Sequence, residues 1–179
     1  FILNHDELNY IYVENKYNFN LGYNRNLYKF LNLLDNFLIL DVDIPLEHNI
    51  IKSMIKHLNY YDLVKPYNDF IYYTNREEKY KFINNEEIDL IFKKKNFSLT
   101  GGCTLFKRNV LESLGGYEEY NGYGYEDRAL DVMILKENFK YLKLNNKIIH
   151  LYHEPSINRF LDVNNTVVNY QTKYYNCLI

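Results

Sequence analysis

The stretch FLILDVDIPL, residues 37–46, joins a fully apolar run to two aspartates. Four consecutive apolar residues, 37–40, are typical of a buried strand, and such strands usually belong to parallel sheets. Asp41 and Asp43 follow at once, so the strand would deliver two carboxylates to its own carboxyl end. In open α/β sheets, ligands bind beyond the carboxyl ends of the strands. The stretch therefore predicts an α/β domain with a site at Asp41 and Asp43.

Outward from this stretch, strand-like and helix-like patterns alternate along the chain. Short apolar or aromatic runs predict strands at 9–14, 37–40, 62–67, 70–75, 103–106, 140–144 and 147–152. Apolar residues at helical spacing predict helices at 24–34, 49–58, 108–114 and 126–136, with a charged helical piece between residues 75 and 95. Gly115 is expected to end the helix at 108–114. The alternation indicates an α/β fold with a largely parallel sheet.

Composition excludes several classes of function. The 179 residues include 21 basic and 23 acidic ones, a net charge of −2. This balance argues against binding of bulk nucleic acid and against a polybasic membrane patch. No apolar run approaches the ~20 residues that cross a bilayer. Two cysteines are too few for a disulfide framework or a four-thiolate zinc site, so a reducing, cytoplasmic location is the default expectation.

The acidic pair predicts a cation site. In an extended chain, Asp41 and Asp43 would project the same way. Two like charges so close need a cation, and a hard divalent ion suits oxygen ligands and could in turn hold a diphosphate. A solvated acidic turn is the alternative, and the D-x-D pattern by itself does not decide between them. An EF-hand is excluded because its sixth position would be Leu46 where glycine is needed.

A glycine-rich block leads to a second pair of carboxylates. Six of the seven glycines lie within residues 101–124, which indicates tight turns or close approach to a ligand. The sequence GYGYED, residues 122–127, fails as a dinucleotide-binding fingerprint because Asp127 stands at the third glycine position. Asp127 could instead take a proton from a hydroxyl, and Tyr123 could stack on a sugar. The alternative is that Glu126 and Asp127 only cap a helix.

Two further blocks carry candidate ligands. His150 and His153 lie in KIIHLYHEP, residues 147–155, at the end of a predicted strand. A spacing of three on a strand points to opposite faces, so at most one imidazole should reach a given metal. Two carboxylates and one imidazole suit Mn²⁺. Arg25, in YNRNLYKF, could reach a phosphate or a base. The alternatives are a structural histidine and a surface arginine in the first turn of a helix.

Taken in order, these four blocks resemble GT-A glycosyltransferases, above all the β-1,4-galactosyltransferase and bacterial chondroitin polymerase group. In that group an F-N-R-type segment precedes a D-x-D strand end, a G-G strand, a G-W-G-G-E-D block and a late histidine. The counterparts here are residues 23–25, 41–43, 101–102, 122–127 and 152–155. The resemblance implies a GT-A domain over residues 1–156, of Rossmann-like nucleotide-diphospho-sugar transferase type, and a tail at 157–179. It also implies truncation before residue 9, where the family has a first strand and helix.

The resemblance assigns a role to each matched residue. Nucleotide and donor-sugar contacts would come from Tyr23, Arg25, Asp41, Val42, Gly102, Tyr123 and Gly124. Ligands of Mn²⁺ or Mg²⁺ would be Asp43 and His153, with His150 as the alternative imidazole and Asp41 as an additional candidate. Glu126 would bind sugar hydroxyls, and Asp127 would be the catalytic base. Tyr125 stands where the family has a glycine.

The function that the resemblance implies is a metal-dependent, inverting glycosyltransferase of hexosyltransferase type. Its donor would be a nucleotide-sugar, with a UDP-sugar favoured, and its acceptor a hydroxyl of a glycan or another molecule. Inversion is expected because the related retaining GalNAc-transferases carry Asn where this chain has Asp127. The alternative is a non-catalytic domain, derived from such an enzyme, that binds a sugar or nucleotide-sugar. A nucleotidyltransferase ranks last because it explains neither residues 123–127 nor residues 152–155.

Overall fold

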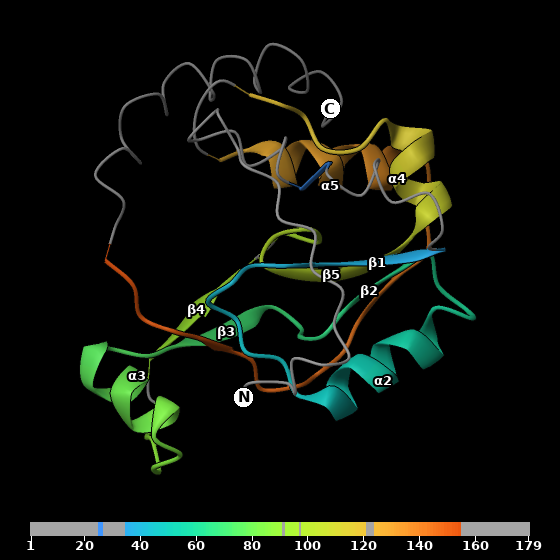
Figure 1. The fold of residues 1–179 in the computed structure, drawn as a ribbon. Helices are drawn as coiled ribbons and strands as arrows, with labels where there is room; N and C mark the ends of the chain where they lie inside the picture. The colour runs from blue at the N-terminus through green and yellow to red at the C-terminus, as the bar shows by residue number, and fades with distance from the viewer. Residues whose placement is uncertain (1–24, 27–34, 91, 97, 121–123, 155–179) are drawn as a thin grey trace, which may run out of the picture.

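Two β-sheets and four helices organise the chain in the computed structural model (Figure 1), which describes residues 25–26, 35–90, 92–96, 98–120 and 124–154. The elements are β1 (Asn36–Leu40), α2 (His48–His57), β2 (Leu63–Lys65), β3 (Phe70–Tyr73), α3 (Arg76–Ile83), β4 (Lys93–Lys95), β5 (Cys103–Lys107), α4 (Arg108–Leu114), α5 (Glu126–Lys136), β6 (Tyr141–Lys143) and β7 (Ile149–His150). The strand expected at 9–14, nearly all of the helix expected at 24–34 and the tail at 157–179 lie outside the described residues. Within them, no helix is long and apolar enough to span a membrane.

Both sheets mix parallel and antiparallel strands. The larger sheet has the order β1-β5-β2-β6, and the smaller one has the order β4-β3-β7. In the larger sheet β5 runs antiparallel to β1 and to β2, and β2 runs parallel to β6. In the smaller sheet β3 is antiparallel to β4 and parallel to β7. The α/β class is thus confirmed.

The expectation of a largely parallel sheet is wrong for the described strands. β1, which its apolar run suggested to be parallel, pairs antiparallel with β5, from Asn36 opposite Lys107 to Leu40 opposite Cys103. The first four residues of β5 are buried, although both of its neighbours are antiparallel. An apolar run indicates that both faces of a strand are covered. It does not indicate the direction of the neighbouring strand.

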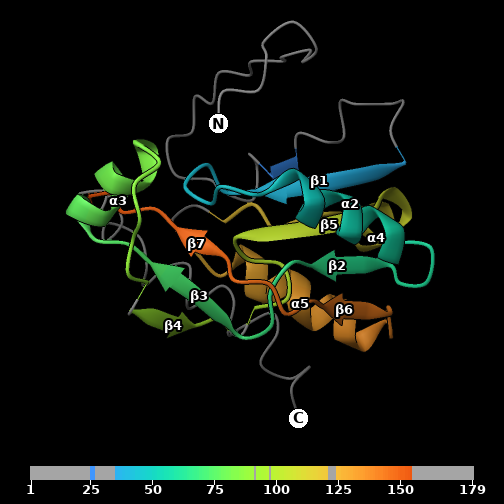
Figure 2. The ribbon, with the colours of Figure 1, turned by 90° about the horizontal axis from the view of Figure 1, so that it is seen from below.

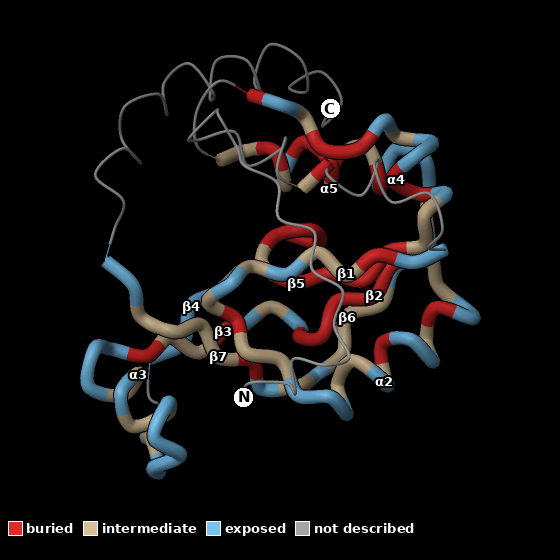
Figure 3. Tube along the Cα trace, in the orientation of Figure 1, coloured by how far each residue is buried: buried red, intermediate tan, exposed pale blue. Residues whose placement is uncertain are grey.

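Helices cover both faces of the larger sheet. On one face, α4 and α5 contribute Val110, Leu111, Leu130 and Ile134 to a cluster that also holds Phe37 and Phe106. On the other face, Met54 of α2 and Leu58, the residue directly after this helix, join a cluster with Val64, Cys103 and Leu105. Figure 3 shows the buried chain along β2, β5 and the inner sides of α4 and α5, and exposed chain on α3. Figure 2 shows the smaller sheet beside the larger one.

The helices that frame the site begin and end as their sequences predict. α5 spans the predicted residues 126–136, and α4 spans the predicted residues 108–114. Gly115 ends α4 in the left-handed conformation, with φ of 77°. Helix α5 begins after Tyr125, which also has a positive φ of 69°. For a bulky side chain this conformation is uncommon and carries a cost in strain.

Candidate functional site

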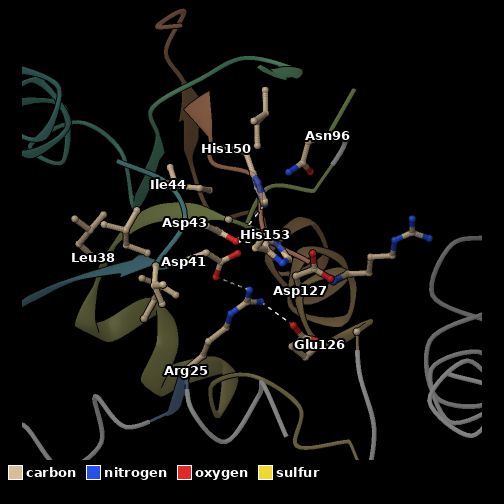
Figure 4. A pocket seen from close by; sticks show the side chains of 18 of the residues that line it. Arg25, Leu38, Asp41, Asp43, Ile44, Asn96, Glu126, Asp127, His150 and His153 are labelled. Carbon is tan, nitrogen blue, oxygen red and sulfur yellow. Dashed lines mark hydrogen bonds and ion pairs between the residues drawn. The ribbon is translucent and has the colours of Figure 1, made fainter. Parts of the chain in front are cut away.

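A cleft of about 970 Å³ opens at the carboxyl end of β1. Its volume lies within the range of sites that bind small molecules. Every sequence-predicted site residue that the structure describes lines it: Arg25, Asp41, Val42, Asp43, Gly102, Gly124, Glu126, Asp127, His150 and His153. Two other candidates, Tyr23 and Tyr123, lie outside the described residues. Five segments that are separated in the sequence therefore meet in one cleft, and Figure 4 shows several of their charged side chains turned toward one another.

The two aspartates of the D-x-D stretch have different partners. The chain turns at Val42 and Asp43, directly after β1, so the extended geometry expected for this stretch does not hold. Asp41 Oδ1 accepts a hydrogen bond from Arg25 Nη2 at 3.1 Å, and the Asp41 main-chain N donates to Gly102 O at 2.8 Å. Asp43 faces the two histidines instead.

Arg25 joins Asp41 to the second carboxylate pair (Figure 4). Its Nη1 donates to Glu126 Oε1 at 2.8 Å, and both of these side chains are almost fully buried. Burial raises the pKa of Glu126 to about 7, although the Arg25 charge acts in the opposite direction. Burial also raises the pKa of Asp41, against the same Arg25 charge. Because it lies between two carboxyl groups, Arg25 stays charged.

Asp43, His150 and His153 form a cluster of metal-ligating type. Asp43 Oδ2 lies 3.1 Å from His153 Nε2 and 3.5 Å from His150 Nε2. One ligand atom from each of the three residues lies within 4.8 Å of the others. The expectation that only one imidazole could reach the site is wrong. Strand β7 ends at His150, so the alternation of a strand does not extend to His153.

The hydrogen bonds of the two imidazoles leave their Nε2 atoms facing Asp43. His150 Nδ1 lies 3.2 Å from Leu151 O, and His153 Nδ1 lies 3.0 Å from Glu154 O. A carbonyl oxygen only accepts, so in the neutral tautomer that satisfies this contact the proton is on Nδ1, and the lone pair of Nε2 is available to a metal ion. Lone pairs of imidazole and carboxylate that face one another favour a cation between them. The donor set therefore fits a divalent metal ion, and the main-chain carbonyls hold the rings as outer partners of metal ligands commonly do.

The three residues of this cluster differ in their other surroundings. Asp43 Oδ1 is buried and has no hydrogen-bond partner among the described residues. A buried polar atom without a partner carries a desolvation cost, which a bound cation would offset. The His150 ring stacks on Tyr73, with ring centroids 4.6 Å apart, and this packing fixes its orientation. The His153 side chain is about half exposed, at 48%, on the open side of the cleft.

Asp127 occupies the opposite wall of the cleft, in the first turn of α5. Its Oδ1 accepts from the Arg128 main-chain N at 2.8 Å. Its Oδ2 lies so close to Gly101 that a Cβ at that position would stand 2.5 Å from it. The glycine therefore permits the contact between the two segments. Glu126, one residue earlier, turns instead toward Arg25 and the interior.

Sequence reasoning missed the polar residues behind the cleft. Asp131 is a half-buried partner of main-chain amides, and Lys65 is fully buried in β2. Two signals could have found them. Asp131 follows Asp127 by four residues and so shares its face of α5, within an otherwise apolar run. Lys65 interrupts an apolar strand directly before a proline.

The cleft thus combines a candidate metal centre, a fixed guanidinium and a carboxylate without a cationic side chain bonded to it among the described residues. A carboxylate with two imidazoles suits Mn²⁺ and other transition metals better than Mg²⁺, which prefers oxygen ligands. No protein-family model, curated protein or solved structure matches this chain. The interpretation of the cleft therefore rests on its own geometry and on the sequence motifs that line it.

Proposed function

We propose that this chain is a metal-dependent, inverting glycosyltransferase of GT-A type, which transfers a sugar from a nucleotide-sugar to an acceptor hydroxyl. One observation carries the proposal. The D-x-D, E-D and histidine blocks that resemble the family in sequence meet in a single cleft, although more than 100 residues separate Asp43 from His150 and His153. A chance resemblance of separate motifs would not require that convergence.

In this proposal Asp43, His150 and His153 hold Mn²⁺. Their donor atoms are close enough to share one ion, and Asp43 Oδ1, which has no hydrogen-bond partner in the described part of the chain, offers a further oxygen. A divalent cation bound there would neutralise the developing charge of a leaving diphosphate. The imidazoles favour Mn²⁺ over Mg²⁺ as the resident ion.

The nucleotide side of the site is assigned to the neighbourhood of Asp41. Its side chain is 40% exposed, so it can accept from a ribose hydroxyl while Arg25 still holds it. Val42 is fully exposed beside it and offers an apolar contact. Tyr23 and Tyr123 keep the nucleotide and sugar contacts that the resemblance implies. Gly124 has a positive φ and open space where a side chain would stand, so a donor sugar can approach its backbone closely. Gly102, for which the resemblance implies a donor contact, also has a positive φ.

Asp127 is the general base of the proposed reaction. Its carboxylate lines the cleft and takes the proton of the acceptor hydroxyl as that oxygen attacks the anomeric carbon. The bond to the diphosphate breaks on the opposite face of the sugar, so the configuration inverts. Glu126 lines the same cleft beside Asp127, and its side chain is held by Arg25.

Tyr125 supports the resemblance from the backbone. The family has a glycine at this place, and Tyr125 adopts the left-handed conformation that glycine adopts without strain. The main chain thus keeps a glycine-like turn before α5, although the side chain has changed.

A screen of nucleotide-sugars tests the proposal. The full chain is incubated with each donor, with and without Mn²⁺, and binding and release of nucleoside diphosphate are measured. In Asp127→Asn, transfer should fall by roughly 10²- to 10⁴-fold while donor binding changes little, because the carboxamide keeps the shape but not the basicity. The exposed Asp89→Asn is the matched control and should leave both unchanged.

Each other outcome has a definite meaning. Mn²⁺-dependent binding without transfer, for every donor and acceptor tried, would favour a non-catalytic nucleotide-sugar-binding domain. Absence of binding to any nucleotide-sugar would contradict the proposal. Equal turnover in wild type and Asp127→Asn would reduce Asp127 to a helix-terminal residue.

A further inference from the structure

The segment from Ser98 to Gly102 is an irregular, largely buried stretch directly behind the cleft. Buried backbone outside helices and sheets must find other hydrogen-bond partners. Here all main-chain donors and acceptors of residues 98–101 are bonded, nearly all of them to side chains. These side chains belong to Lys65, Tyr67, Asn96, Ser98, Thr104, Tyr117 and Asp131. So many dedicated partners indicate a segment whose position matters.

Two charges of opposite sign hold this segment, the half-buried Asp131 and the buried Lys65. On one side, Asp131 of α5 accepts from the main-chain N of Leu99 and of Thr100, each at 2.9 Å. On the other side, the Lys65 ammonium donates to the main-chain oxygens of Ser98 and Gly101. The peptide N–H groups thus face the anion and the carbonyls face the cation. Charge-assisted hydrogen bonds of this kind are about twice as strong as neutral ones.

Thr100 ties the segment to the first turns of α5. Its hydroxyl lies 2.8 Å from Asp131 Oδ1 and 2.8 Å from the main-chain O of Asp127. The side chain is 1% exposed, so water cannot replace these contacts. Its backbone O also accepts from the Tyr117 hydroxyl, at 3.2 Å.

The far end of the segment contacts both carboxylate pairs of the cleft. Gly102 O accepts from the main-chain N of Asp41 at 2.8 Å. Gly101 lies directly against Asp127 Oδ2, with no room for a Cβ. The segment therefore spans from the end of β1 to the start of α5. Its position sets the separation between Asp41 and Asp127.

We propose that Thr100 and Asp131 are positioning residues, which act through the segment 98–102 to hold the Asp127 carboxylate at a fixed place relative to the end of β1. The inference rests on the proposed function, in which Asp127 is the general base. A displaced carboxylate is still a base, but it lies less often in the geometry in which it can take the proton of the acceptor hydroxyl. A misplacement of about 1 Å can lower a rate by about 10²-fold.

The pair Thr100→Val and Thr100→Ser tests the inference. Valine keeps the shape of threonine and removes the hydroxyl, whereas serine keeps the hydroxyl. We expect kcat to fall by about 10- to 100-fold in Thr100→Val. We expect the Kd values for Mn²⁺ and for the nucleotide-sugar to change less than about twofold, and Thr100→Ser to recover most of kcat. An unchanged kcat in Thr100→Val, or a serine variant as slow as the valine variant, would overturn the inference.

Gly101→Ala is a second variant that leaves the Thr100 hydroxyl intact. Its Cβ would press on Asp127 Oδ2, so the carboxylate must move. We expect the same loss of kcat, about 10-fold or more, with donor affinity preserved. A kcat equal to that of the wild type would mean that the place of Asp127 does not depend on this contact, which contradicts the inference.

Hydrogen exchange separates this inference from the proposed function. If the wild-type chain transfers no sugar, the proposed function fails, but amide exchange still reports whether Thr100 positions α5. We expect faster exchange in Thr100→Val at residues 98–102 and in the first turns of α5, with α2 and β3 unchanged. No local change, or an equal change throughout the chain, would overturn the positioning role.

Discussion

Asp41 and Asp43 are two residues apart, yet the protein treats them in opposite ways. Asp41 is bonded to Arg25, whose other amino group is bonded to the buried Glu126. Among the described residues, Asp43 has imidazole nitrogens near one oxygen and no hydrogen-bond partner on the other. The first carboxylate is neutralised by the protein's own cation. The surroundings of the second carboxylate would instead suit a bound metal ion.

The comparison separates two functions of a D-x-D stretch. One aspartate belongs to an internal ion-pair network, and the other belongs to the candidate metal-ligand cluster with His150 and His153. Because the chain turns between them, one does not substitute for the other. Four substitutions test this difference between Asp41 and Asp43.

The largest effect is expected from Arg25→Met. Loss of the guanidinium leaves Glu126 and Asp41 without their shared cation, and an uncompensated buried charge is strongly destabilising. We expect the free energy of unfolding, measured in urea at pH 8, to fall by about 3 kcal/mol. Lys81→Met breaks an exposed pair on α3 and should leave stability nearly unchanged. Equal stability in Arg25→Met and wild type would show that Asp41 is not held by an internal cation.

A pH series on Glu126→Gln examines the same network. The pKa of Glu126 is raised from 4.5 to about 7 by burial, so the folded chain binds this proton more tightly than the unfolded chain. Its contribution to stability is therefore complete below about pH 4.5 and is lost as the pH rises through about 7. Relative to Glu126→Gln, wild type should lose about 3 kcal/mol of unfolding free energy over this range. A difference between the two proteins that does not vary with pH would contradict the raised pKa.

Asp43→Asn addresses the other aspartate. Removal of the carboxylate charge from the Asp43, His150 and His153 cluster should weaken Mn²⁺ binding by at least about 10²-fold, a loss comparable to the largest effects of outer-shell substitutions. Without metal, the same variant should be as stable as wild type, because Asp43 Oδ1 has no partner to lose among the described residues. Calorimetric titration with Mn²⁺ and a urea melt in chelator give both values. Retained Mn²⁺ affinity would remove Asp43 from the ligand set.

The smallest effect on the metal is expected from Asp41→Asn. Since Asp41 is bonded to Arg25, its loss should change the Mn²⁺ affinity by less than about tenfold, or 1.4 kcal/mol. Stability should fall instead, in the same direction as in Arg25→Met. If Asp41→Asn weakened Mn²⁺ binding as much as Asp43→Asn does, the two aspartates would share one ion and the distinction would fail.

Local sequence patterns predicted the bounds of the helices and strands around this cleft better than they predicted how the strands pair. Helix α5 begins and ends as expected because a glycine-rich turn precedes an apolar periodicity. The direction of β1 was not predictable, since burial on both faces is common to parallel and antiparallel neighbours here. The expectation that only one of His150 and His153 could reach the site was wrong because β7 ends at His150, a boundary that the sequence did not show.

The partners of the polar residues behind the cleft could not be predicted, for a different reason. Asp131 bonds to main-chain amides of Leu99 and Thr100, which are 32 and 31 residues away in the sequence. Almost any residue type can supply a main-chain N–H, so the sequence does not show which residues are these partners. A carboxylate within an apolar helical run therefore indicates that it has a partner, but not which residue supplies it.

The register of β1 on β5 also has a consequence for folding. Leu40 pairs with Cys103, and the hydrogen bond from Asp41 to Gly102 continues that ladder by one step into the cleft. Contacts between segments so distant in the sequence must first close a long loop, and proteins rich in them fold slowly. The carboxylates of the cleft therefore come together only when the central ladder closes. During synthesis, a ribosome-bound chain that has exposed β1 but not β5 would hold the D-x-D stretch without the surroundings that distinguish its two aspartates.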